Sequence, residues 1–185
     1  ENTILTLDLA PGVVERASDN PLARASAGGS VILHDTVDAL AMAAEDERVK
    51  GVAVRLGRGG LGFAQAQALH QAVRRFRESG KPAYAFAETL AGIARGGTLH
   101  GYLTSAFDEV WMQPSGDWSV TGFQLESPFL RGLLDKVGIA PRLAQREEYK
   151  GLKNQFTDRG LPAPQRENLQ RLMDSWYAQL VDGLA

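Results

Sequence analysis

A strand, a long helix and a second strand follow one another in the first half of the chain, and this unit constrains the fold most strongly. Residues 52–56 form an apolar strand pattern, and residues 63–79 carry apolar side chains at helical spacing. The helical stripe consists of Ala66, Leu69, Val73 and Phe76. Gly80 and Pro82 end the helix before a short strand at residues 83–87. This order predicts parallel strand pairing in an α/β fold.

Strands and helices also alternate along the rest of the chain. Residues 3–9 read as an opening strand, and residues 10–29, rich in Pro, Gly, Ser and Ala, predict a long loop. Further strands are predicted at residues 109–112, 120–125 and 139–144, and further helices at 31–44 with Ser30 as cap, 93–105, 129–137 and from Pro164 onward. The last helix carries a wide apolar stripe of Leu169, Leu172, Met173, Trp176 and Leu180. Such a stripe faces either the core or a partner.

Composition excludes several classes of function. The chain has 185 residues and a net charge of −2 without a basic run, so nucleic acid is not expected as a partner. It has no cysteine, which excludes disulfides, thiolate metal sites and a cysteine nucleophile. His34, His70 and His100 are not spaced as metal ligands, and we expect neither a metal nor a cofactor. Apolar runs fall short of the roughly 18 residues of a membrane span.

A glycine-rich turn after the strand at residues 52–56 matches a dinucleotide-binding fingerprint. Gly57, Gly59 and Gly62 have the G-x-G-x-x-G spacing between a strand and a helix, and Glu88 follows the next strand, where it would bind a ribose hydroxyl. However, Glu88 comes 26 residues after Gly62, where about 20 is usual. A tight structural turn, or a loop whose N–H groups approach a substrate carbonyl, explains the pattern equally well.

Lys150 is the candidate for acid–base chemistry. A lysine amine accepts a proton near neutral pH only where its pKa lies well below the usual value of about 10.4, and loss of water is the common cause. Leu152 and Phe156 are four residues apart, so on a helix they would share a face and pack inward beside Lys150. On these residues alone, a solvated lysine is the simpler interpretation. The chain has no G-x-S-x-G nucleophile motif, so a base is present without its nucleophile.

A series of modest landmarks occurs in a specific order over nearly the whole chain. They are the Gly59-Gly60 turn, Ser79-Gly80-Lys81-Pro82, Gly101-Tyr102-Leu103, Val110-Trp111-Met112-Gln113-Pro114, Gly122-Phe123, Leu133-Leu134-Asp135-Lys136 and Tyr149-Lys150. Their order and spacing resemble the N-terminal half of long-form signal peptide peptidase A (protease IV).

The resemblance implies a fold and a catalytic role. It implies an α/β, crotonase-like (ClpP-like) fold of repeated ββα units with a C-terminal amphipathic helix, covering residues 1–185 as one domain. It implies a serine peptidase with a Ser/Lys dyad, in which Lys150 is the general base and the C-terminal half of the same protein supplies the serine. Leu99 stands where short members carry the serine, so this half is expected to be inactive alone. Gly151-Leu152 replace the family's usual Ser-Ala after the lysine.

The resemblance also implies partners and a location. The substrates would be cleaved signal peptides, and the enzyme would be a homo-oligomer in the bacterial inner membrane, facing the periplasm. Because the chain begins at Glu1 without methionine, we expect it to be an excised piece whose membrane segment lies elsewhere. Two alternatives stay open: a dinucleotide-binding domain using Gly57, Gly59, Gly62 and Glu88, and a structural half without chemistry.

Overall fold

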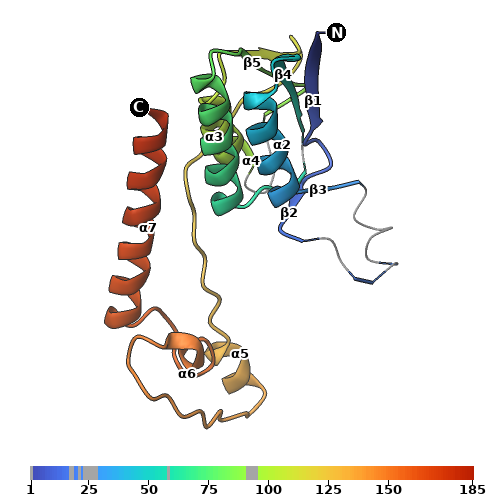
Figure 1. Ribbon diagram of the computed structural model, residues 1–185. Coiled ribbons are helices and arrows are strands. Elements are labelled where there is room, and N and C mark those ends of the chain that lie inside the picture. The colour runs from blue at the N-terminus through green and yellow to red at the C-terminus, as the bar shows by residue number, and fades with distance from the viewer. Residues whose placement is uncertain (1, 17–18, 21, 23–28, 58, 91–95) are drawn as a thin grey trace. The chain divides into compact units, whose positions relative to one another are not determined.

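The computed structural model describes residues 2–16, 19–20, 22, 29–57, 59–90 and 96–185 (Figure 1). The chain forms two compact units. The first consists of residues 1–121 with residue 184, and the second of residues 122–183 with residue 185. Each unit is described by itself below.

The first unit is built on a parallel sheet. Its strands lie in the order β1 (Thr3–Asp8), β4 (Val49–Leu56), β5 (Ala83–Ala87) and β6 (Glu109–Met112). Helices α2 (Leu33–Glu45), α3 (Phe63–Glu78) and α4 (Gly96–Thr104) lie on the same face of this sheet (Figure 1). Two short strands, β2 (Val13–Val14) and β3 (Val31–Ile32), form a second parallel pair. The predicted α/β fold with parallel pairing is therefore confirmed.

The core lies between the sheet and these helices. Alternate residues of a strand point to opposite faces, and in β4 the buried side is formed by Val52, Val54 and Leu56. The predicted stripe of α3 is buried as a whole, with Ala66, Leu69, Val73 and Phe76 no more than 2% exposed. Strand β5 contributes only Ala83, Ala85 and Ala87 to this side. Small side chains allow the helices to approach the sheet closely.

The other face of the sheet carries two rows of side chains set by the strand register. One row runs across Thr6, Ala53, Tyr84 and Glu109. The next row runs across Asp8, Arg55, Phe86 and Trp111. Among the residues that the structure describes, large apolar side chains of this face are exposed to solvent, with Trp111 63% exposed and Phe86 43% exposed.

The second unit consists of short helices and one long helix. They are α5 (Arg131–Lys136), the 3-10 helix η1 (Gly151–Lys153), α6 (Asn154–Thr157) and α7 (Ala163–Leu184). As predicted, Pro164 lies in the first turn of α7. Gly138, with a φ of +72°, follows the end of α5. Within the described ranges, no helix is both long enough and apolar enough to cross a membrane.

Two predicted strands are wrong. Residues 120–125 are irregular because their first residues pack against α4 and not against the sheet: the N–H of Thr121 donates to Oγ1 of Thr98 at 3.1 Å. A Cβ at Gly97 would overlap the carbonyl of Ser119, which explains the glycine in this helix. Residues 139–144 are also irregular. Ile139 continues the turn after α5, with its N–H bonded to the carbonyl of Leu134 at 2.9 Å.

The start of the second helix also differs from the prediction. Val31 and Ile32 pair with β2, so α2 begins at Leu33 and Ile32 occupies the cap position without a side-chain hydrogen bond. Ser30 is not the cap. Its hydroxyl instead donates to the carbonyl of Pro11 at 3.3 Å. The pairing of two strands thus overrides a local capping preference.

Candidate functional site

Lys150 lies in the second unit, immediately before η1. Its backbone N–H donates to the carbonyl of Glu147 at 3.1 Å, and its side chain is exposed in this chain. The prediction that Leu152 and Phe156 share an inward face is wrong, because Leu152 is 74% exposed while Phe156 is half-buried. A 3-10 turn has 3.0 residues per turn, so the change from η1 to α6 breaks the i, i+4 alignment. The chain alone does not remove water from Lys150.

The backbone next to Lys150 is held by α7. Gly151 is buried, and a Cβ there would lie 2.5 Å from Oε1 of Gln165 and 2.8 Å from its Nε2. Asn154, only 5% exposed, donates from Nδ2 to the same Oε1 at 3.2 Å. A side chain on the residue after the lysine would displace the amide of Gln165 and disturb its hydrogen bond with Asn154. Sequence reasoning missed Gln165 and Asn154, since amides at these positions carry no motif.

Tyr149 also contacts α7. Its hydroxyl donates to Oε2 of Glu167 at 3.0 Å, and the other carboxylate oxygen of Glu167 pairs with Arg171 at 2.8 Å. The hydrogen bond to Glu167, together with that negative charge, raises the pKa of Tyr149 above its usual value. The Tyr149-Lys150-Gly151 segment is thus attached to α7 on both sides of the lysine.

The expected position of a nucleophile lies in the first unit and holds no hydroxyl. Leu99 is in α4 and is 7% exposed. A serine and a histidine do meet just after the same helix, where Ser105 Oγ lies 3.2 Å from Nε2 of His70. However, that hydroxyl donates to the carbonyl of Tyr102 at 2.7 Å, as a helix-terminal serine commonly does. The Ser105 hydroxyl therefore has a backbone acceptor in addition to its contact with His70.

The glycine turn after β4 packs against the segment that follows β1. A Cβ at Gly57 would lie 2.5 Å from that of Ala10, and one at Gly59 would lie 2.5 Å from the carbonyl carbon of Pro11. The N–H of Gly59 donates to the carbonyl of Ala10 at 3.1 Å, and the N–H of Gly62 donates to Oε1 of Gln65 at 2.8 Å. Both N–H groups therefore have acceptors within the protein. The structural interpretation of the turn is favoured over phosphate binding, which needs free N–H groups.

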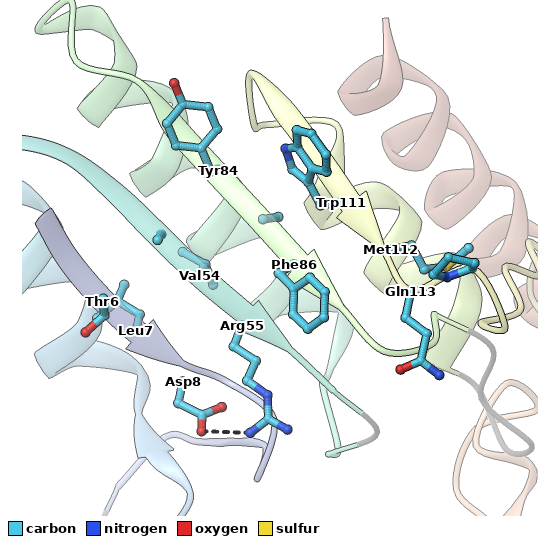
Figure 2. Close-up of a pocket in the computed structure, with 13 residues that line it drawn as sticks. Thr6, Leu7, Asp8, Val54, Arg55, Tyr84, Phe86, Trp111, Met112 and Gln113 are labelled. Atoms are coloured by element: carbon cyan, nitrogen blue, oxygen red, sulfur yellow. Dashed lines mark hydrogen bonds and ion pairs between the residues drawn. The ribbon is translucent and has the colours of Figure 1, made fainter.

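Glu88 is also engaged within the protein. Its carboxylate accepts a hydrogen bond from Arg55 at 2.6 Å, and the same guanidinium pairs with Asp8 at 3.4 Å. Figure 2 shows Arg55 and Asp8 side by side at the ends of neighbouring strands. A ribose hydroxyl would have to displace Arg55. The signal that could have revealed this cluster is a single arginine in an otherwise apolar strand.

The face of the sheet turned away from α2, α3 and α4 forms a concave surface in the first unit. It has a volume of about 780 Å³ and is lined by residues of all four strands (Figure 2). No group of three or more His, Asp or Glu side chains in the described part of the chain is placed to hold a metal ion.

Comparison with known proteins identifies the family. Residues 75–185, more than half of the chain, match the family described as Peptidase family S49. The chain belongs to this peptidase family. The matched region includes Lys150 and Leu99 and leaves the glycine turn outside.

Three curated relatives carry names that agree with this family. The chain is 27% identical over 143 residues to Serine protease SPPA, chloroplastic, from Arabidopsis thaliana, covering 77% of this chain and 20% of the relative. It is 26% identical over 148 residues to Protease 4 of Haemophilus influenzae, covering 80% and 23%. It is 27% identical over 188 residues to Protease 4 of Salmonella typhi, covering 95% and 29%. The chain therefore spans less than a third of each relative, and it is similar to part of a signal peptide peptidase A.

Proposed function

We propose that this chain is the N-terminal half of a two-half serine endopeptidase, and that Lys150 is its general base. Both units would belong to one crotonase-like half spanning residues 1–185. The observation that carries the proposal is the Peptidase family S49 match over residues 75–185, a range that includes Lys150. The family resemblance is what puts this lysine at the Tyr-Lys position. The attachment of this segment to α7 through Tyr149 and Gly151 supports a role that needs a fixed backbone.

The chemistry requires a hydroxyl from the other half. A serine Oγ attacks the peptide carbonyl while the ε-amine of Lys150 accepts the serine proton, and the same proton then passes to the leaving amine. Backbone N–H groups stabilise the oxyanion, and in this proposal they too come from the C-terminal half. The buried Leu99 is consistent with this division, because it places an unreactive side chain at the corresponding position of this half.

The exposure of Lys150 defines what the other half must do. A lysine works as a general base only where its side chain is shielded from water. In the proposal, assembly with the C-terminal half covers the Lys150 side chain and removes water from it. The exposed Leu152 beside it offers an apolar contact for this covering surface.

The substrates and location follow from the same proposal. We propose that the enzyme degrades cleaved signal peptides, forms a homo-oligomer and acts at the bacterial inner membrane with its catalytic part in the periplasm. The membrane segment would lie outside the chain described. The names of the bacterial relatives support a protease, and the substrate class rests on the family resemblance.

Replacement of Lys150 tests the catalytic role. Lys150→Ala in the full-length enzyme should lower kcat by about 10³-fold or more, since general-base catalysis contributes on the order of 10²–10⁴. Oligomer size, measured by light scattering, should stay unchanged. Lys153→Ala, three residues away, is the matched control and should retain kcat within about threefold. Activity that survives the loss of Lys150 but not of Lys153 would contradict the assignment.

A further inference from the structure

The uncovered face of the main sheet is apolar at its centre. Tyr84 and Phe86 project from β5 and Trp111 from β6, and these rings are 38%, 43% and 63% exposed. Phe86 and Trp111 are register partners, so the two rings lie beside each other (Figure 2). We refer to Tyr84, Phe86 and Trp111, with the neighbouring Asp8 and Arg55, as the aromatic sheet face.

Such a face is unusual for a parallel sheet. Parallel sheets almost always have both faces covered, because crossover helices bury them. Here α2, α3 and α4 cover one face only (Figure 1). Strand β5 points three alanines toward the helices and both of its aromatic rings away from them. A concave surface of about 780 Å³ has the size of a ligand pocket, for which roughly 300–1,000 Å³ is typical.

The border of this face carries an excess of negative charge. Asp8 and Glu88 both pair with Arg55, whose single positive charge balances the negative charge of only one of the two carboxylates. On the other side, Glu109 accepts a hydrogen bond from Nε1 of Trp111 at 3.0 Å and forms no ion pair within the described residues. Three carboxylates therefore face one guanidinium. Apolar rings with an acidic border complement a ligand that is apolar and basic at one end.

We propose that the aromatic sheet face binds a peptide segment in which basic residues precede an apolar run. This inference rests on the proposed function, because a signal peptide has this order: a positively charged region followed by about 7–15 apolar residues. The face would hold the apolar run against Phe86 and Trp111 and the basic end near Asp8 and Glu88. A second copy of the chain brings the same acidic border and lacks this complementarity.

Binding is measured without cleavage. The full-length enzyme carrying Lys150→Ala is titrated with a fluorescent peptide of two lysines followed by about ten leucine and alanine residues. Phe86→Thr and Trp111→Thr keep a residue suited to a strand and should each raise the Kd at least about tenfold, as expected for a central aromatic contact. Tyr177→Thr removes an aromatic ring of equal exposure, 64%, from α7 and should leave the Kd unchanged. Circular dichroism confirms that each variant is folded.

A second peptide tests the charge. Replacing its two lysines by glutamates should raise the Kd by about threefold to tenfold at low salt, and the difference should shrink when Asp8→Asn and Glu88→Gln are combined. Equal binding of both peptides, or an unchanged Kd in both aromatic variants, overturns the proposal. So does a result in which these variants dissociate the oligomer without affecting peptide affinity, because another subunit or segment then covers the face. The proposed function has a separate readout. If the Lys150→Ala enzyme cleaves the peptide, Lys150 is not the general base.

Discussion

At the scale of single residues, Lys81 stabilises the end of a helix. Its Nζ donates to the carbonyls of Ala43, Ala44 and Asp46 at 2.8–2.9 Å. The first two are carbonyls in the last turn of α2, which the helix end leaves without helical partners, and Asp46 is the residue that follows the helix. Lys81→Met keeps the apolar stem and removes all three bonds, so we expect the free energy of unfolding to fall by about 2 kcal/mol. Urea denaturation measures the change. Lys50→Met, at an exposed position, is the control and should cost much less.

Asp108 makes stability depend on pH. Its carboxylate accepts the N–H of Ala83 at 2.8 Å and the Nε of Arg77 at 2.8 Å, and these contacts, the backbone bond first, lower its pKa below 3.8. The stabilisation is therefore complete above the unfolded value of 3.8 and is lost as the pH falls through the lower folded value.

The Asp108→Asn variant isolates this contribution. It should be less stable than the parent protein near about pH 7, and the gap should narrow at an acidic pH below 3.8, as the pH falls toward the lowered folded pKa of Asp108. Urea midpoints at the two pH values measure both effects. An equal loss at both values would show that the hydrogen bonds, and not the charge, account for the stability. Asp182→Asn, at an exposed position of α7, is the control.

At the scale of secondary-structure elements, substitutions in the glycine turn after β4 test whether its glycines are needed for packing. Gly59 touches the backbone of the segment after β1, whereas nothing lies within 4 Å of a Cβ at Gly60, one residue further along the same turn. Gly59→Ala should lower the free energy of unfolding by more than about 2 kcal/mol, because rigid backbone has to move. Gly60→Ala should be neutral or slightly stabilising. Thermal denaturation of the two variants compares them directly, and equal behaviour would contradict the packing explanation.

A binding measurement tests the dinucleotide hypothesis. Calorimetric titration of the parent protein with NAD or NADP should give no binding heat, because the N–H groups of Gly59 and Gly62 already have acceptors. Clear saturable heat that disappears in Glu88→Gln would restore that hypothesis.

At the scale of the whole molecule, the second unit buries little of its own apolar surface. Between residues 122 and 183 only Gly151, Asn154 and Leu180 are buried. Leu133 and Val137 are 59% and 60% exposed. Apolar side chains exposed in such number mark a surface that another polypeptide covers, which is consistent with the proposed two-half oligomer.

Polar substitutions on this surface should weaken assembly. Leu133→Ser combined with Val137→Ser should shift the full-length enzyme toward smaller species in light scattering, because about 2 kcal/mol or more of apolar burial is lost in each interface. Met42→Ser, at a position of α2 with 66% exposure, should not change the size. An unchanged oligomer in the double variant would show that this part of the unit stays in water.

The strongest periodic patterns were sufficient to predict their elements. The α3 stripe and the strands at residues 83–87 and 109–112 appear as expected, because each pattern is local and its period belongs to one kind of element. The strands predicted at 120–125 and 139–144 failed because a strand needs a neighbour in a sheet, and an apolar run does not reveal whether one is present. The family was also readable from the order of short motifs, although none of them is specific alone.

Sequence alone thus determined the α/β architecture, the strand–helix–strand core and the position of the lysine, since these depend on local periodicity and on motif order. Tertiary structure decided which contacts those residues make. It assigned the glycine turn to backbone packing, placed Gln165 over Gly151 and left Lys150 and the aromatic sheet face exposed. The reason is physical: burial and hydrogen-bond partners depend on residues far apart in the chain, and no local pattern encodes which of them meet.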